Sequence, residues 1–285
     1  MNQEHGQRFL LELPAVQSDL PFSPALLPRL FRLTDEDGRS PLEAIAAAIA
    51  EDQGLSSRVL AMANSAFYGF QFQVGSVARA VTVLGLREIR SLVLALGMRG
   101  LAARRPLPRG FALPRYLEHQ FAVALAARAL AGQTRAMAPD DAFTAGVLHD
   151  IGKLVTALYR PDDWLAQAAL VAREGIPWHE AETRHFGLDH GLIGSMVLRS
   201  WNLPETVTEP VNWHHAPESA PGRREPGYVI NCADAMVRLL TGDRTMAHVL
   251  ETAPAALGLT AASAQAGVTA ALAAQNPALL AAALL

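Results

Sequence analysis

The chain has 285 residues, of which 51% are hydrophobic, and a formal net charge of −3. This length and composition allow one large buried core or two modest ones, and the nearly balanced charge gives no overall attraction to nucleic acid or to an anionic membrane. The single cysteine, Cys232, excludes an intramolecular disulfide and fits a reducing cytoplasm, and the polar start MNQEHGQRFL lacks the layout of a signal peptide.

The first clear helical periodicity begins near residue 40. The stretch SPLE at 40–43 combines an N-cap serine, a proline at the first helical position and a capping-box glutamate. Leu42, Ile45 and Ile49 follow at the spacing of one buried helix face. The pattern predicts an amphipathic helix that begins at this capping box.

Further helix starts are predicted downstream. Ser56 or Ser57 precedes a second apolar stripe, and Ser76 precedes a third, which Gly85 interrupts before the stripe resumes. No window of strict period-two alternation bounded by turn residues competes with these patterns. The sequence therefore predicts an all-α protein.

Loop-forming residues divide the chain into parts. Residues 100–114 are rich in glycine, proline and arginine, which indicates a linker or long loop between two helical halves. A second loop is predicted at 216–227, and Pro210 is expected to break its helix near Glu209. The alanine-rich segment 261–285 is interrupted by polar residues, so it is predicted to be a packed or frayed helix and not a membrane span.

Most of the candidate functional residues in the second half of the chain are histidines. His119 lies on an inward helical stripe, and His149 and Asp150 stand inside the apolar stretch VLHDIGKLV at 147–155. The pattern also places four further side chains on inward faces or at helix ends: His190, His214, His215 and Asp234. The remaining histidines show no such placement: His5, His179, His185 and His248.

Each of these side chains has an ordinary explanation when it is taken alone. A single inward histidine is more often a hydrogen-bonded core residue than a ligand, and an inward aspartate is more often a cap or an ion-pair partner. Several imidazoles and two carboxylates together are harder to explain, because one shared cation would compensate the desolvation of all of them. Mixed imidazole and carboxylate ligands favour Fe, Mn, Ni or Zn. The pattern predicts one or two such divalent ions, with a metal-free cluster as the alternative.

Several longer segments resemble a known family. ANSAFYG (63–69), AVTVLGLREIRSLVLALGM (80–98), HDIGKL (149–154) and FGLDHGLIGSMVLRSWNLP (186–204), followed by the histidine pair, are similar to the HDOD family over about residues 20–240. Residues 251–285 are expected from their composition to form an alanine-rich helical tail. The resemblance implies an N-terminal helical bundle (20–105) followed by an HD-like helical subdomain (110–250). It also implies a role in bacterial signalling and regulation, usually without demonstrated hydrolase activity.

The order H…HD…D resembles the wider HD superfamily of metal-dependent phosphohydrolases, and the additional histidines resemble its HD-GYP branch. This resemblance implies metal ligands at His119, His149, Asp150, His190, His214, His215 and Asp234. Two departures count against cyclic-di-GMP hydrolysis. Ala-Pro-Glu-Ser follows the histidine pair in place of a Gly-Tyr-Pro segment, and Arg115 stands where some HD-GYP enzymes have a glutamate.

Two residues are candidates for catalysis if the site is active. Asp150 is placed to bridge two ions, which would activate a bound water and polarise a phosphoryl oxygen. Lys153 is the one lysine among 24 basic residues, and we expect its compact ammonium to meet a substrate phosphate. The alternative is that a single lysine is chance in an arginine-biased composition.

The competing interpretation is a regulatory interaction module. Seven arginines between residues 79 and 109 could dock an acidic partner or a nucleotide, or form a solvated helix face: Arg79, Arg87, Arg90, Arg99, Arg104, Arg105 and Arg109. No aromatic platform or reading helix accompanies them, so direct nucleic-acid binding is not expected. We predict a cytoplasmic, HDOD-type signalling protein that acts through an unidentified signalling partner, without membrane contact. A metal-dependent phosphohydrolase acting on a nucleotide or cyclic dinucleotide is the alternative.

Overall fold

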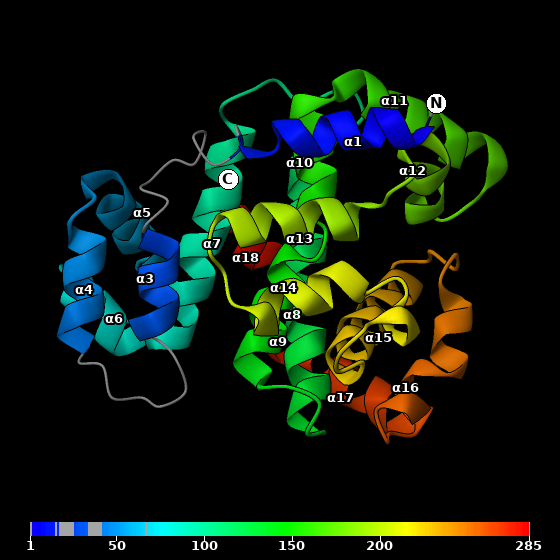
Figure 1. The fold of residues 1–285 in the computed structure, drawn as a ribbon. Coiled ribbons are helices and arrows are strands. Elements are labelled where there is room, and N and C mark those ends of the chain that lie inside the picture. Colours follow the sequence, from blue (N-terminus) through cyan, green and yellow to red (C-terminus); the bar gives the residue numbers. More distant parts are fainter. Residues whose placement is uncertain (1, 15, 17–25, 34–41, 66–67, 285) are drawn as a thin grey trace.

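The computed structural model describes residues 2–14, 16, 26–33, 42–65 and 68–284. Every secondary-structure element within these ranges is helical, which confirms the all-α prediction. Figure 1 shows a smaller group of helices from the first part of the chain beside a larger group from the second part. The buried apolar side chains of both groups form one continuous hydrophobic cluster, so the two groups share a core.

The smaller group contains five helices. They are α3 (Leu26–Leu33), α4 (Leu42–Ala50), α5 (Gln53–Ala63), α6 (Val77–Leu84) and α7 (Leu86–Ala102). The predicted stripe on α4 is confirmed for Ile45 and Ile49, which are fully buried, whereas Leu42 is 38% exposed and lies off the buried face. The predicted cap at residues 40–41 lies outside the described residues.

Capping explains where these helices begin and end. The Ser76 side chain accepts the backbone N–H of the third residue of α6, at 3.1 Å, as predicted. Gly85, with a φ of 80°, separates α6 from α7. The predicted start of α5 at residues 56–57 is wrong, because Asp52 caps the helix earlier and accepts the Leu55 N–H at 2.9 Å.

The larger group surrounds α8 (Leu113–Gly132), which is buried along most of its length. Its other main helices are α9 (Pro139–Leu148), α10 (Ile151–Tyr159), α11 (Pro161–Glu174), α12 (Trp178–Phe186), α13 (His190–Ser200), α14 (Glu205–Trp213) and α15 (Glu225–Leu240). A 3-10 turn, η1 (Pro217–Ser219), lies in the predicted second loop, whose last residues already belong to α15. The predicted seam contains the non-helical connection 103–112 between α7 and α8.

The predicted break at Pro210 is wrong. α14 runs without interruption from Glu205 to Trp213, with the buried Pro210 inside it. Proline removes one hydrogen bond and crowds the preceding turn, but it does not have to end a helix whose other bonds and packing remain. His214 and His215 therefore follow the end of α14 and not a break within it.

The chain termini pack against the larger group. α1 (Asn2–Glu12) lies along α12, where Phe9 stacks on Phe186 with a ring separation of 5.6 Å (Figure 1). After η2 (Ala247–Glu251) and α16 (Ala253–Ala256), the last helices are α17 (Ala261–Ala274) and α18 (Pro277–Leu284), and both contact α8. No helix in the described part of the chain is long and apolar enough to cross a membrane.

Three arginines of the predicted arginine strip interact with side chains of the chain itself. Arg90 is only 5% exposed and donates to Asp141 Oδ1 at 3.2 Å, which ties α7 to α9. Arg79 lies over the ring of Phe72, 5.3 Å from its centre. Arg105 lies over an aromatic ring in the same way, at the end of α10. The strip is therefore not one uniform solvated face.

Candidate metal centre

The His149–Asp150 pair occupies the junction between two helices. His149 is the C-cap of α9, and Asp150 is the N-cap of α10. The two side chains leave the chain at a change of helix direction, so both reach the same buried space, and they are 0% and 3% exposed. Gly152 allows this junction to approach α13, because a Cβ at this position would lie 2.2 Å from the carbonyl oxygen of His190. The glycine in HDIGK is thus required by close helix packing.

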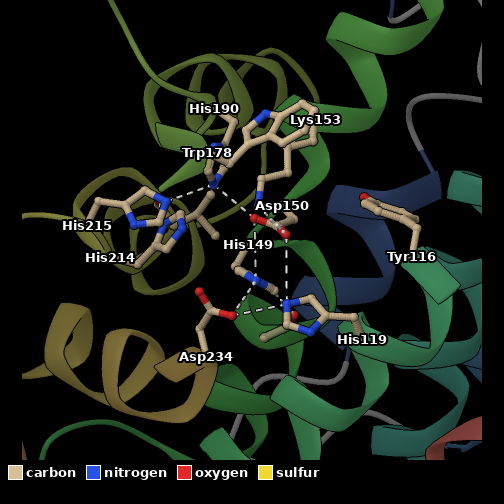
Figure 2. A network of polar contacts seen from close by, with 12 residues as sticks. Tyr116, His119, His149, Asp150, Lys153, Trp178, His190, His214, His215 and Asp234 are labelled. Carbon is tan, nitrogen blue, oxygen red and sulfur yellow. Dashed lines mark hydrogen bonds and ion pairs between the residues drawn. The ribbon is translucent and has the colours of Figure 1, made fainter. Parts of the chain in front are cut away.

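We call the first cluster the group formed by His119, His149, Asp150 and Asp234, which come from α8, the α9–α10 junction and α15 (Figure 2). His119 Nε2 lies 3.0 Å from Asp234 Oδ1 and 3.9 Å from Asp150 Oδ2. His149 Nε2 lies 3.5 Å from Asp150 Oδ1 and 4.0 Å from Asp234 Oδ1. His119, His149 and Asp150 thus each offer one ligand atom within 4.8 Å of the other two, and Asp234 adds an oxygen beside both imidazoles.

We call the second cluster the group formed by His190, His214 and His215. His190 begins α13 behind the predicted N-cap, Asp189, whose side chain accepts a backbone N–H of that helix at 3.0 Å. His215 Nε2 lies 2.8 Å from His190 Nε2, and one nitrogen of each of the three rings lies within 4.8 Å of the others. Asp150 joins the two clusters, because its Oδ1 lies 2.9 Å from His190 Nε2 (Figure 2). The structure thus brings all seven predicted ligands into one centre.

Backbone carbonyls fix two of the rings. His149 Nδ1 lies 2.8 Å from the Gly146 oxygen, and His214 Nδ1 lies 2.7 Å from the Val211 oxygen. A carbonyl can only accept, so each Nδ1 carries the hydrogen and each Nε2 directs its lone pair into the centre. Both Nε2 atoms are buried and have no hydrogen-bond partner among the described residues.

Orphaned acceptors of this kind fit a metal ion. A buried nitrogen without a partner is costly, and coordination removes that cost. Two ligands bound to one ion at about 2.0–2.2 Å lie roughly 3–4 Å apart over the usual coordination angles. The ligand-to-ligand distances of 3.0 to 4.0 Å in the first cluster match that range. The donor set of imidazole and carboxylate suits Mn, Fe, Ni or Zn.

Two cations of the chain already hold the carboxylates. Lys153 Nζ donates to Asp150 Oδ2 at 2.8 Å, and Arg238 Nε donates to both oxygens of Asp234 at 2.8 and 3.0 Å. Burial raises the pKa of Asp150, but His149 and then Lys153 outweigh it and hold that pKa well below its usual value. Burial likewise raises the pKa of Asp234, and the Arg238 guanidinium reverses the effect. Both carboxylates are therefore ionised and able to bind a cation.

Three histidines of the centre are neutral at pH 7. Burial lowers the pKa of His149 to about 4 and holds the pKa values of His214 and His215 well below their usual range. His190 differs: burial lowers its pKa, but the Glu182 carboxylate outweighs burial and raises the pKa to about 9. A metal ion would therefore meet three neutral imidazoles and would displace a proton from His190.

Three residues of α12 belong to the centre and were missed in the sequence. Glu182 is fully buried and accepts from His190, Trp178 donates to Glu182 at 2.9 Å, and His179 stacks on His215 with a ring separation of 4.1 Å. One signal was available, since Trp178, Glu182 and Phe186 recur every four residues and place the carboxylate on an otherwise apolar face. The neighbouring His185 pairs instead with an acid of α11.

Comparison with known proteins gives relatives with the same fold. A candidate phosphohydrolase from Shewanella amazonensis is 25% identical, with a TM-score of 0.74 over 96% of this chain and 98% of that protein. An HDOD domain protein of unknown function from Geobacter sulfurreducens is 22% identical, with a TM-score of 0.71 over 96% and 94% of the two chains. A candidate signal transduction protein from Marinobacter aquaeolei is 19% identical, with a TM-score of 0.79 over 100% and 66%.

The sequence is also similar to that of an uncharacterised protein from Treponema pallidum. The two are 28% identical over 227 residues, which are 79% of this chain. The matched part spans 43% of the length of that relative. The family model of the HDOD domain matches residues 20–217, which is more than half of the chain and includes six of the seven converging ligands. The chain belongs to the HDOD family.

Proposed function

We propose that this protein is a cytoplasmic regulatory HDOD module whose HD centre binds one or two divalent transition-metal ions. The observation that supports metal binding is the convergence of histidine nitrogens on two ionised carboxylates, with the buried Nε2 atoms of His149 and His214 left without a hydrogen-bond partner among the described residues. The cytoplasm is proposed because the one cysteine, Cys232, is buried and unpaired. The regulatory output then passes to a signalling protein partner.

Burial of the centre supports regulation over turnover. Four of the ligands are fully buried, namely His149, His190, His214 and Asp234. The centre reaches solvent only slightly at His119 and Lys153, which we call its open edge, because these side chains are only 21% and 11% exposed. A small ion can enter through such an edge more easily than a nucleotide can reach the bridging carboxylate.

One observation favours phosphohydrolysis as a second candidate. Lys153 stands at the open edge beside Asp150, where its ammonium could hold a substrate phosphate once the metal takes over the carboxylate. The bound metal would supply an activated water. The 25% identical protein from Shewanella amazonensis, named as a candidate phosphohydrolase, fits this alternative.

Metal analysis and thermal unfolding test the proposal. Reconstituted wild type should retain Mn, Fe, Ni or Zn, and metal at 100 times its Kd should stabilise it by about 2.7 kcal/mol, or roughly 4–5 °C in Tm. His119→Ala and His215→Ala each remove one partly exposed ligand and should bind less metal. His248→Ala changes an exposed histidine outside the centre and should bind as wild type does.

Identical melting curves with metal and with chelator, across all four metals, would refute metal binding. A phosphodiesterase screen of the metal-loaded protein separates the two candidates. We expect no turnover of nucleotides or cyclic dinucleotides. Turnover that is lost in Lys153→Met would replace the regulatory proposal with the phosphohydrolase.

A further inference from the structure

Helix α12 supplies a buried acid to the second cluster. Glu182 is 0% exposed, and one of its oxygens, Oε2, accepts from both the backbone N–H of His190 at 2.9 Å and the ring Nδ1 of His190 at 2.5 Å. Its other oxygen, Oε1, accepts from the indole nitrogen of Trp178 at 2.9 Å. Both oxygens are thus used, and the carboxylate cannot rotate without losing a hydrogen bond.

These contacts determine which atom of His190 faces the metal centre. A carboxylate accepts hydrogen bonds, so the hydrogen on His190 Nδ1 points to Glu182 and the ring turns Nε2 inward. That Nε2 lies 2.9 Å from Asp150 Oδ1 and 2.8 Å from His215 Nε2, at the contact between the two clusters. The bond from Glu182 to the His190 backbone also fixes the first residue of α13. One acid therefore sets both the ring orientation and the position of its backbone.

We infer that Glu182, held in place by Trp178, is the positioning residue that orients His190 for metal binding in the second cluster. This inference rests on the proposed metal binding. Outer carboxylates that accept from a ligating imidazole fix its tautomer and increase its basicity, and their loss typically lowers metal affinity about 10- to 100-fold. A purely structural role for Glu182 would stabilise the fold without changing the affinity of that cluster.

The isosteric variant Glu182→Gln separates these roles. Glutamine has only one acceptor oxygen. If that oxygen still accepts the indole N–H of Trp178, the amide nitrogen faces the two N–H groups of His190, so that donors face donors. His190 can relieve this only by moving its ring or by carrying its hydrogen on Nε2, the atom that would bind the metal. Glu180→Gln is the matched control, because Glu180 lies on the same helix and makes an ion pair with Arg184, whose side chain is 48% exposed.

The first measurement needs no metal. Nitrogen-15 NMR of the histidine rings in chelator-treated protein should show a slowly exchanging Nδ1–H hydrogen on His190 in wild type and in Glu180→Gln. This resonance should be lost or should exchange rapidly in Glu182→Gln. Trp178→Phe keeps an aromatic ring and removes the indole N–H, so it should weaken the resonance and carries the test if Glu182→Gln does not fold. An unchanged resonance in Glu182→Gln would overturn the inference.

The second measurement is metal affinity by chelator competition in His119→Ala protein, in which the second cluster is complete. Adding Glu182→Gln should lower the affinity about 10- to 100-fold, and adding Glu180→Gln should leave it unchanged. Equal affinity in all three would overturn the inference. If wild type binds no metal at all, the proposed function fails, while the NMR result still decides whether Glu182 orients His190.

Discussion

The metal-free protein should lose stability steeply when the pH falls from 6.5 to 5. Burial lowers the pKa of His149 and of His179 to about 4 and holds the pKa values of His214 and His215 well below their usual range. The unfolded chain, with ordinary histidine pKa values near 6.5, therefore binds more protons than the folded chain in this interval. Stability rises with pH across the interval, and acidification favours the unfolded state.

The size of the effect follows from these directions. A histidine with a folded-state pKa of about 4, such as His149 or His179, loses about 1.6 kcal/mol of stabilisation between pH 6.5 and 5, so these two together lose about 3 kcal/mol. His214 and His215 add to the loss in the same direction. His190 does not offset this loss. Its pKa is raised to about 9, so it is protonated in both states below pH 6, and its stabilisation is lost only as the pH rises from 6.5 through 9. Because ordinary domains are stable by only about 5–15 kcal/mol, this loss should remove a large part of the stability of the metal-free protein near pH 5.

Urea unfolding in the presence of chelator, at pH steps between 5 and 7, measures the slope directly. His179→Asn should reduce the loss between pH 6.5 and 5 by about 1.6 kcal/mol, since it removes one of the four groups. His179 stacks on His215 but belongs to neither cluster, so its replacement leaves all the proposed ligands in place. His248→Ala, at an exposed position, should leave the slope unchanged. A free energy of unfolding that does not vary over this interval, or an unchanged slope in His179→Asn, would refute the reasoning.

Two further predictions concern packing and charge. Gly152→Ala should destabilise the protein by about 1–3 kcal/mol in urea unfolding, because the added Cβ would meet the His190 backbone, whereas Gly132→Ala enters open space and should be neutral or slightly stabilising. Equal effects would contradict the close approach. Arg238→Met should cost about 3–5 kcal/mol in metal-free protein by leaving Asp234 without its cation. Added metal should then raise the Tm of this variant more than that of wild type, and an equal rise would argue against coordination by Asp234.

Local patterns were sufficient for the residues that lie on one helix or at its end. The spacing on α8 and α15 predicted that His119 and Asp234 turn inward, and the N-cap before His190 predicted the start of α13. These inferences use only the 3.6-residue period and capping, which are properties of a single segment. The start of α5 differs from the predicted one because Asp52 is as good an N-cap as the two later serines and stands before them.

The rest of the centre depends on how separate segments pack. Lys153 was predicted to meet a substrate, but in the structure it lies one turn after Asp150 and neutralises it. Glu182 and Trp178 join the centre only because α12 packs across the start of α13, and no periodicity reports which helix another helix faces. The sequence around His179 gives no sign of a site for the same reason. His179 lies beside the centre only because the packing of α14 places His215 next to it.

The internal cations explain how the same centre could serve regulation or catalysis. Lys153 balances Asp150 and Arg238 balances Asp234, so the carboxylates alone offer a metal ion little net negative charge. A divalent ion would then make this buried space net positive, and neutral imidazoles can share that charge without cancelling it. Two responses lower the cost: loss of a proton from His190, or arrival of an anion at the edge beside Lys153. If His190 loses its proton, metal binding changes the protonation and packing of the protein. If an anion arrives beside Lys153, metal binding brings a phosphate to the metal. Which response dominates is therefore the physical difference between a regulatory centre and a phosphohydrolase built from the same residues.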